Sequence, residues 1–219
     1  MLFGATLTPQ VIRLASQWTC DPVTVEIDPE RVAVDTVDQV VYLVRSRERF
    51  TILYNMISRQ NLKRVLVFCN RRDQTRRLAD RLKGHGISCA VLSGEVAQQK
   101  RIKTLEEFRS GNIRVMVATD VAGRGIHIEG ISHVVNYNLP LDAEDYVHRI
   151  GRTGRAGATG ASVGFATEDE SFQIPAIERY LGEVLRCVYP DDALLTLVPP
   201  PAAGDSLQLH PPASRPRRR

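Results

Sequence analysis

The stretch RVLVFCNRRDQTRRLADRLKGHGISCAVLSG, residues 64–94, decides the fold expected of this chain. It begins with RVLVFCN and ends with SCAVLSG, two short apolar runs typical of buried strands. Between them, RRDQTRRLADRLKG is interpreted as a helix that ends at Gly84, because glycine is common at helix C-termini. A strand, a helix and a strand in this order predict two parallel strands joined by a crossover helix.

The same alternation extends along most of the chain. Further strands are expected at residues 22–27, 37–44, 114–120, 132–140 and 161–167, and further helices at 7–18, 47–60, 96–111, 142–150 and 169–181. Short apolar strands alternating with helices indicate a mostly parallel sheet with helices on both faces. The expected fold class is therefore α/β, with a single domain of this kind, and ligands are expected at the carboxyl ends of its strands.

Length and composition exclude several classes of protein. With 219 residues, 43% of them hydrophobic and 25% charged, the chain fits one soluble globular domain plus its ends. No apolar run is long enough to span a bilayer, and the N-terminus lacks the pattern of a signal peptide, so no membrane association and a cytoplasmic location are expected. The four cysteines lie far apart and no Cys/His pair has zinc spacing. They are interpreted as reduced packing residues, and no metal site is expected.

The C-terminal residues differ from the rest. Seven of the 12 prolines lie between Pro190 and Pro216, and the last eleven residues hold four arginines and no acid. Without these four, the 29 basic residues fall to 25, which equals the number of acids. Residues 189–219 are therefore expected to be a mostly disordered tail whose arginines add nonspecific affinity for a polyanion such as a nucleic acid, a solubilising end being the alternative. The body must bind any anion with individually placed groups.

Polar residues follow three of the expected strands. Asn70 precedes Arg71 and Arg72, Gly94 lies in Ser-Gly-Glu, and Thr119 precedes Asp120. Parallel strands end at one edge of the sheet, so these groups form a rim suited to phosphate oxygens. Taken singly, each has an ordinary explanation as solvated charge, turn or helix cap.

The segment HRIGRTGRAG, residues 148–157, is more specific. Its arginines and its glycines each recur at every third residue. Glycine allows the backbone to approach a ligand closely, and arginines at this spacing can point toward one dense negative charge, such as a triphosphate. A basic surface loop explains the arginines but not their phase with the glycines.

Together, VLVFCN, the Q-x-x-R of residues 98–101, VATDVAGRGIHI and YVHRIGRTGRAG resemble motifs IV, V and VI of the DEAD-box RNA helicases, with the Q-x-x-R element between them. The resemblance covers residues 35–182, the second of that family's two RecA-like domains. The ATDVAxRGxHI segment, the SGEVAQQKR stretch and the arginine-rich tail are similar to those of the bacterial RhlB type. GAT at residues 4–6 resembles the S-A-T motif that ends the first domain, with Gly4 in place of serine.

No G-x-x-x-x-G-K-[ST] and no D-E-A-D occur in the chain. The resemblance therefore implies that ATP and Mg²⁺ are bound mainly by a first RecA-like domain outside this sequence, and that this chain alone has no ATPase activity. It also implies domain bounds: residues 1–30 are the end of the first domain and a linker, 31–188 the second domain, and 189–219 the tail.

The resemblance assigns a role to each site residue. Arg152 and Arg155 are the expected catalytic arginine fingers. The expected ATP-binding residues are Asp120, Gly125, His127, His148 and Arg149, and the expected RNA-binding residues are Asn70, Arg72, Gly94, Glu95, Arg101 and Thr119. His127 stands where the family usually has aspartate, which would alter the contact with the ATP ribose and make it sensitive to pH.

RNA is the expected partner, bound through its backbone without sequence preference, since base-reading motifs are absent. Strand separation would follow from ATP-driven closure of the two domains. An alternative reading is a protein-docking module of an RNA degradosome, because the RhlB type uses this domain to bind the endoribonuclease RNase E. A DNA helicase or translocase of the same superfamily is a third reading. The HRIGRTGRAG and ATDVAxRG segments disfavour it, because DNA-directed relatives usually vary these residues.

Overall fold

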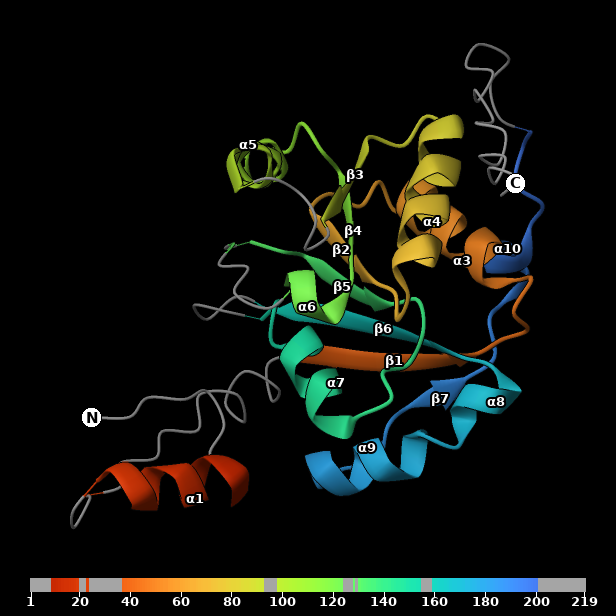
Figure 1. The fold of residues 1–219 in the computed structure, drawn as a ribbon. Helices are drawn as coiled ribbons and strands as arrows, with labels where there is room; N and C mark the ends of the chain where they lie inside the picture. Colours follow the sequence, from red (N-terminus) through yellow and green to blue (C-terminus); the bar gives the residue numbers. More distant parts are fainter. Residues whose placement is uncertain are drawn as a thin grey trace, which may run out of the picture.

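The computed structural model describes residues 9–19, 23, 37–92, 98–123, 128, 130–154 and 159–200. Within them a seven-stranded, wholly parallel sheet runs in the order β3-β4-β2-β5-β6-β1-β7 (Figure 1). The strands are β1 Val37–Leu43, β2 Val65–Phe68, β3 Cys89–Leu92, β4 Val115–Ala118, β5 His133–Asn136, β6 Gly160–Ala166 and β7 Cys187–Val188. The predicted α/β fold with a parallel sheet is confirmed.

Helices connect and cover these strands. They are α1 Pro9–Trp18, α3 Arg49–Arg59, α4 Arg72–Gly84, α5 Gln98–Arg109, α6 Asp120–Gly123, α7 Ala143–Ile150, α8 Glu168–Ser171, α9 Ile174–Leu181 and α10 Asp192–Leu195. The helix predicted over residues 169–181 is divided into α8 and α9, because Phe172 and Gln173 form a turn before Pro175 at the start of α9. The strand expected at 22–27 lies almost wholly outside the described residues.

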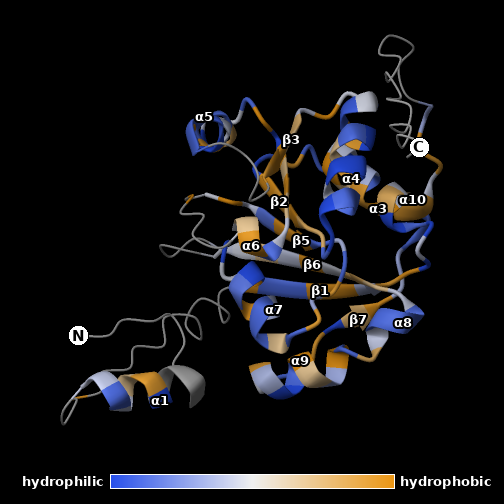
Figure 2. Ribbon diagram, in the orientation of Figure 1, coloured by the Kyte–Doolittle hydropathy of each residue, from blue (hydrophilic) through white to orange (hydrophobic). Residues whose placement is uncertain are grey.

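The apolar residues of the central strands alternate between two cores, as side chains on a pleated strand must. Val65 and Val67 face α3, α4 and α10, whereas Leu66 and Phe68 face α5 and α6. A third cluster packs α7 and α9 on that second side, beneath β1 and β6. Figure 2 shows apolar residues along β2, β3 and β4 at the centre and polar residues over much of α4 and α5, whereas α10 is apolar. The sheet is thus covered on both faces, as the alternating pattern predicts.

The order of connections creates a crevice. β2 and β5 are neighbours and end level with each other, Phe68 opposite Asn136. The helix that follows β2, α4, covers one face, whereas the helix that follows β5, α7, covers the other. A ligand-binding crevice forms at the carboxyl ends of a parallel sheet where neighbouring connections diverge in this way.

Two sequence predictions need correction. The tail expected from residue 189 begins with ordered structure: Nδ2 of Asn55 on α3 donates to the carbonyls of Leu194 and Thr196, at 2.8 Å each, which holds α10 against α3. These two hydrogen bonds from one buried amide hold the residues around α10 in place, although the tail is rich in proline. Cys69 and Cys89 are buried packing residues, but Cys187 is exposed on the two-residue strand β7. The arginine-rich end, 209–219, and Cys20 lie outside the described residues.

No helix in the described part of the chain is long and apolar enough to cross a membrane.

Candidate functional site

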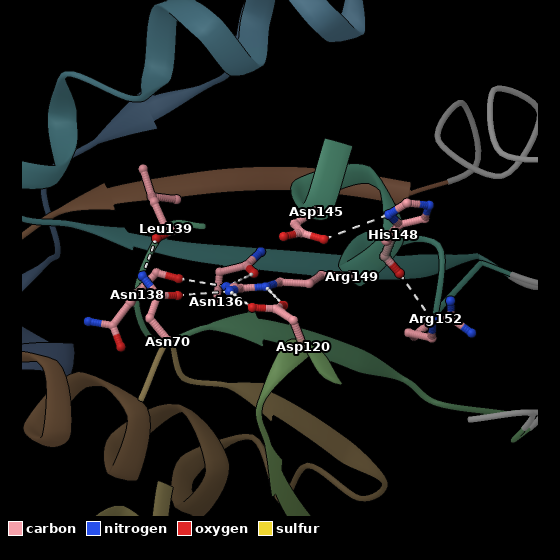
Figure 3. Close-up of polar contacts among 9 residues, drawn as sticks. All are labelled: Asn70, Asp120, Asn136, Asn138, Leu139, Asp145, His148, Arg149 and Arg152. Carbon is pink, nitrogen blue, oxygen red and sulfur yellow. Dashed lines mark hydrogen bonds and ion pairs between the residues drawn. The ribbon is translucent and has the colours of Figure 1, made fainter. Parts of the chain in front are cut away.

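Arg149 occupies the crevice between β2 and β5. Only 1% of its surface is exposed, and its guanidinium makes five hydrogen bonds (Figure 3). Nε and Nη2 donate to the two carboxylate oxygens of Asp120 at 2.5 and 2.8 Å, and Nη2 also donates to Oδ1 of Asn70 at 2.8 Å. Nη1 donates to Oδ1 of Asn136 at 3.0 Å and to the carbonyl of Asn138 at 2.8 Å. We call these five residues the Arg149 network.

The network joins elements that are distant in sequence. Asn70 follows β2, Asp120 begins α6 after β4, Asn136 ends β5, and Arg149 comes from α7. A buried arginine is tolerated only where its donors are matched and its charge is paired. The bidentate bond to Asp120 supplies the pairing, and the ring of Phe68, 5.3 Å from the guanidinium carbon, forms the apolar floor. The crevice that could hold a ligand is therefore filled by a side chain of the protein itself.

Asn70, predicted to touch RNA, has its side-chain amide engaged inside the protein. Besides accepting from Arg149, it donates through Nδ2 to the carbonyl of Leu139 at 2.9 Å. Its amide thus bridges the end of β2 to the segment after β5. In this arrangement the Asn70 amide supports the strand ends from inside the protein. Any contact of residue 70 with RNA would then be made by its backbone.

Asn138 connects the Arg149 network to a second buried ion pair. Its Nδ2 donates to Oε1 of Glu170 at 3.0 Å, while its carbonyl faces Arg149. Glu170 also forms an ion pair with Arg49 of α3, whose Nη2 donates to Oγ1 of Thr167 at 3.2 Å. Arg49 and Arg149 lie on opposite faces of the sheet, so Asn138 links the two at the rim.

Arg152 lies beyond the end of α7, in the turn that begins at Gly151. Its Nε donates to the carbonyl of His148 at 3.1 Å, and its side chain is half-buried. Figure 3 places it apart from Arg149, on the far side of His148. The His148 ring lies between two acids of its own helix, with Nε2 3.9 Å from Glu144 and Nδ1 3.9 Å from Asp145. The two arginines thus differ in burial and in partners, although both line one small hollow together with Asp120 and His148.

The remaining rim residues are placed less centrally. Nη2 of Arg101 donates to the carbonyl of Ala122 at 2.8 Å, tying α5 to α6. The carbonyl of Thr119 accepts from the backbone nitrogens of Ala122 and Gly123 at 3.1 and 2.8 Å, which starts α6. Arg72 is exposed at the first position of α4.

Five predicted site residues lie outside the described residues: Gly94, Glu95, Gly125, His127 and Arg155. Two members of the Arg149 network, Asn136 and Asn138, were missed by sequence reasoning. The signal that could have found them is the pair of amides in NYN at the end of β5, on the strand that neighbours β2. The described residues contain no group of three or more histidines, cysteines and acids that could hold a metal ion.

Comparison with known proteins identifies the family. Residues 48–157 match the model of the helicase conserved C-terminal domain. The chain is 56% identical over 199 residues to the ATP-dependent RNA helicase RhlB of Pseudomonas putida and 58% identical over 199 residues to that of Pseudomonas aeruginosa. Each match covers 91% of this chain and 50% of the relative, so the chain spans about half the length of these curated relatives.

Solved structures agree with this result. The S. cerevisiae protein Dbp5 bound to RNA and ADP BeF3 is 31% identical, with a TM-score of 0.76 over 87% of this chain and 51% of that one. The E. coli DEAD-box protein SrmB bound to the regulator of ribonuclease activity A is also 31% identical, with a TM-score of 0.68 over 76% of this chain and 98% of that one. The chain therefore belongs to the helicase conserved C-terminal domain family, as the C-terminal RecA-like domain of a DEAD-box RNA helicase of the RhlB type.

Proposed function

We propose that this chain is the C-terminal half of an enzyme that couples ATP hydrolysis to the separation of short RNA duplexes, in RNA decay. In this role it binds the RNA backbone along its strand ends and supplies arginine fingers to ATP held by an N-terminal half. The relatives named above are ATP-dependent RNA helicases, which supports the substrate and the cofactor. Arg152 and Arg155 are the proposed fingers, and a cytoplasmic location is part of the proposal.

One observation carries this proposal: Arg149 fixes α7 to the rim, while Arg152 leaves that helix at its end. A guanidinium that stabilises charge on a transferring phosphoryl group must be held in place and still be accessible to the phosphoryl oxygens. Arg149 is buried in a bidentate bond to Asp120, whereas the side chain of Arg152 is half-buried in the wall of a small hollow at the same strand ends. Arg152 is thus the better placed of the two described arginines to meet a triphosphate.

ATP and Mg²⁺ are proposed to be held mainly by the N-terminal half. From this chain, Asp120, His148 and Arg149 would contribute by orienting the turn that carries Arg152, and Gly125 and His127 by contacting the nucleotide. When bound, the metal ion would neutralise phosphate charge. For RNA, the proposed contacts are Arg72, Gly94, Glu95, Arg101, Thr119 and the backbone at Asn70.

The test is an ATPase assay on this chain alone and on a protein joining it to the N-terminal half of a relative. The chain alone should show no turnover, and the joined protein should hydrolyse ATP faster when single-stranded RNA is added. It should also separate a duplex of about one helical turn. Turnover by the isolated chain, or a joined protein indifferent to RNA, would contradict the proposal.

A second candidate function is protein docking, with RNase E in a degradosome as the partner. The observation that favours it is a pair of exposed apolar side chains on either side of α9, outside the Arg149 network: Phe172 and Val184 are 81% and 86% exposed. Exposed apolar groups gathered in one segment are typical of interaction sites. Titration calorimetry with the helicase-binding segment of RNase E would test it, using Phe172→Asp and Val184→Asp. Binding that both variants retain would exclude this face.

A further inference from the structure

A cavity lies at the same strand ends as the Arg149 network but on the opposite, α4 side. It measures about 480 Å³, and three arginines of the α4 region, two aromatic residues and the amides of Asn70 and Asn138 are among its walls. The arginines are Arg71, Arg77 and Arg81, and the aromatic residues are Phe50 and Tyr137. We call it the α4 pocket. Its volume falls within the range of pockets that hold small organic ligands, about 300–1,000 Å³.

The pocket carries excess positive charge. Two acids line it, but Glu170 is neutralised by its ion pair with Arg49. That leaves Asp73 alone against three arginines, and it lies 3.4 Å from Arg71 and 3.8 Å from Arg77. Burial raises the pKa of Tyr137 to about 12, so its phenol is neutral and repels no anion at neutral pH. The walls therefore favour an anionic ligand.

The pocket also offers a flat surface. The guanidinium carbon of Arg81 lies 3.6 Å from the centre of the Phe50 ring, so the planar group is stacked on the aromatic one. One face of the guanidinium is then covered by Phe50, and the other is available to a second planar group. Unpaired RNA bases stack on arginine planes as they do on aromatic rings.

We propose that the α4 pocket binds one unpaired nucleotide of the RNA strand, with its phosphate at Arg71 and Arg77 and its base stacked on Arg81. Asn70 and Asn138 of the Arg149 network also line this pocket, so the nucleotide would be held next to the rim, on the face of the sheet opposite α7. The inference rests on the proposed RNA-binding function and adds a site that grips a base. It assigns the ligand to a strand rather than to a free nucleotide, because Arg71 of the pocket wall is next in the chain to the exposed Arg72, one of the proposed RNA contacts.

The test measures binding of a fluorescent 12-nucleotide uridine strand to the 219-residue chain by anisotropy. Arg77→Gln with Arg81→Gln should weaken binding at least tenfold. The matched control is Lys63→Gln with Lys83→Gln, which removes the same charge from exposed lysines outside the pocket walls and should change affinity less than twofold. Arg81→Lys keeps the charge but lacks the plane, and should still weaken binding severalfold. Thermal unfolding of each variant confirms that it is folded.

The outcomes are distinguishable. If wild type binds the strand and both double variants bind it equally well, or lose affinity equally, the α4 pocket is not a nucleotide site while the proposed function stands. If the wild type binds RNA neither in this assay nor when it is joined to an N-terminal half, the proposed function itself fails. Binding of free uridine monophosphate that the pocket variant loses, with RNA affinity unchanged, would overturn the assignment to a strand. Photo-crosslinking of 4-thiouridine RNA to Phe50 or Tyr137 would support it.

Discussion

Arg149 and Arg152 come from the same arginine repeat, and the protein uses them in different ways. Arg149 is buried on α7, with every guanidinium nitrogen bonded inside the domain. Arg152 is half-buried just after the helix and contacts the carbonyl of His148 through Nε. The first arginine holds the strand ends together, and the second is the more accessible of the two and is the one proposed to act on ATP.

The end of α7 produces this difference. Residues three apart on a continuous helix share a face, so Arg149 and Arg152 would point the same way if the helix continued. It ends at Ile150, and Thr153 anchors the following turn by donating from Oγ1 to the carbonyl of Ile131 at 2.5 Å. The turn therefore leaves Arg152 half-buried beside the crevice, in the wall of a small hollow that it shares with Arg149. Gly154, two residues after Arg152, has φ of +68°, where other residues are strained, so glycine is favoured where the chain leaves this turn.

The largest expected effect on folding is that of Arg149→Ala. Removing one partner of a buried ion pair leaves Asp120 and three amide or carbonyl acceptors without their donor, which costs about 3–5 kcal/mol. Urea unfolding followed by circular dichroism measures it. Arg152→Ala, as the matched control, should lower the free energy of unfolding by less than about 1 kcal/mol. Equal losses from the two variants would remove the distinction between the arginines.

Asn70→Ala tests whether the amide next to Arg149 is structural. It removes an acceptor of Arg149 and the donor to the carbonyl of Leu139, so we expect a loss of about 1–3 kcal/mol in the free energy of unfolding. If Asn70→Ala instead left stability unchanged and weakened only RNA affinity, the side chain would serve RNA directly.

Cys69 reports on the network without changing it. It lies at the end of β2, and burial raises the pKa of its thiol to about 12, so alkylation by iodoacetamide at pH 8 should be slow. Arg149→Ala should speed its alkylation by about tenfold or more by opening the strand ends, as judged by peptide mass spectrometry against the buried Cys89 as internal reference. Arg152→Ala should leave the rate unchanged. Rapid alkylation of Cys69 in the wild type would contradict the closed crevice.

The smallest effect concerns pH. Burial lowers the pKa of His133, which is neutral in the folded protein at neutral pH. The unfolded chain takes up this proton first as pH falls through about 6.5, so stability should decline below that pH. His133→Gln should flatten the decline. Because His133 is no member of the Arg149 network, the gap between Arg149→Ala and Arg152→Ala should be the same at pH 7.5 and pH 6.

The sheet and the edge at which its strands end could be predicted from the sequence, because both follow from short apolar runs. Runs such as VLVF and VMVA have few other ways to be buried than as central strands, so the sheet and its rim follow. The interior role of Arg149 could not be predicted, because its partners at positions 70, 120 and 136 meet only after the strands are ordered. The same holds for α10, whose carbonyls are captured by Asn55 on α3, and for Glu170, which the sequence presents as an ordinary helix acid.

The most direct test of the account is the RNA-stimulated ATPase rate of Arg152→Ala in a protein joining this chain to the N-terminal half of a relative. We expect a loss of about 10²-fold or more, with unchanged affinity for single-stranded RNA and unchanged stability. An ATPase rate equal to that of the wild type would mean that Arg152 does not act on ATP, and would contradict the division of roles between Arg152 and Arg149.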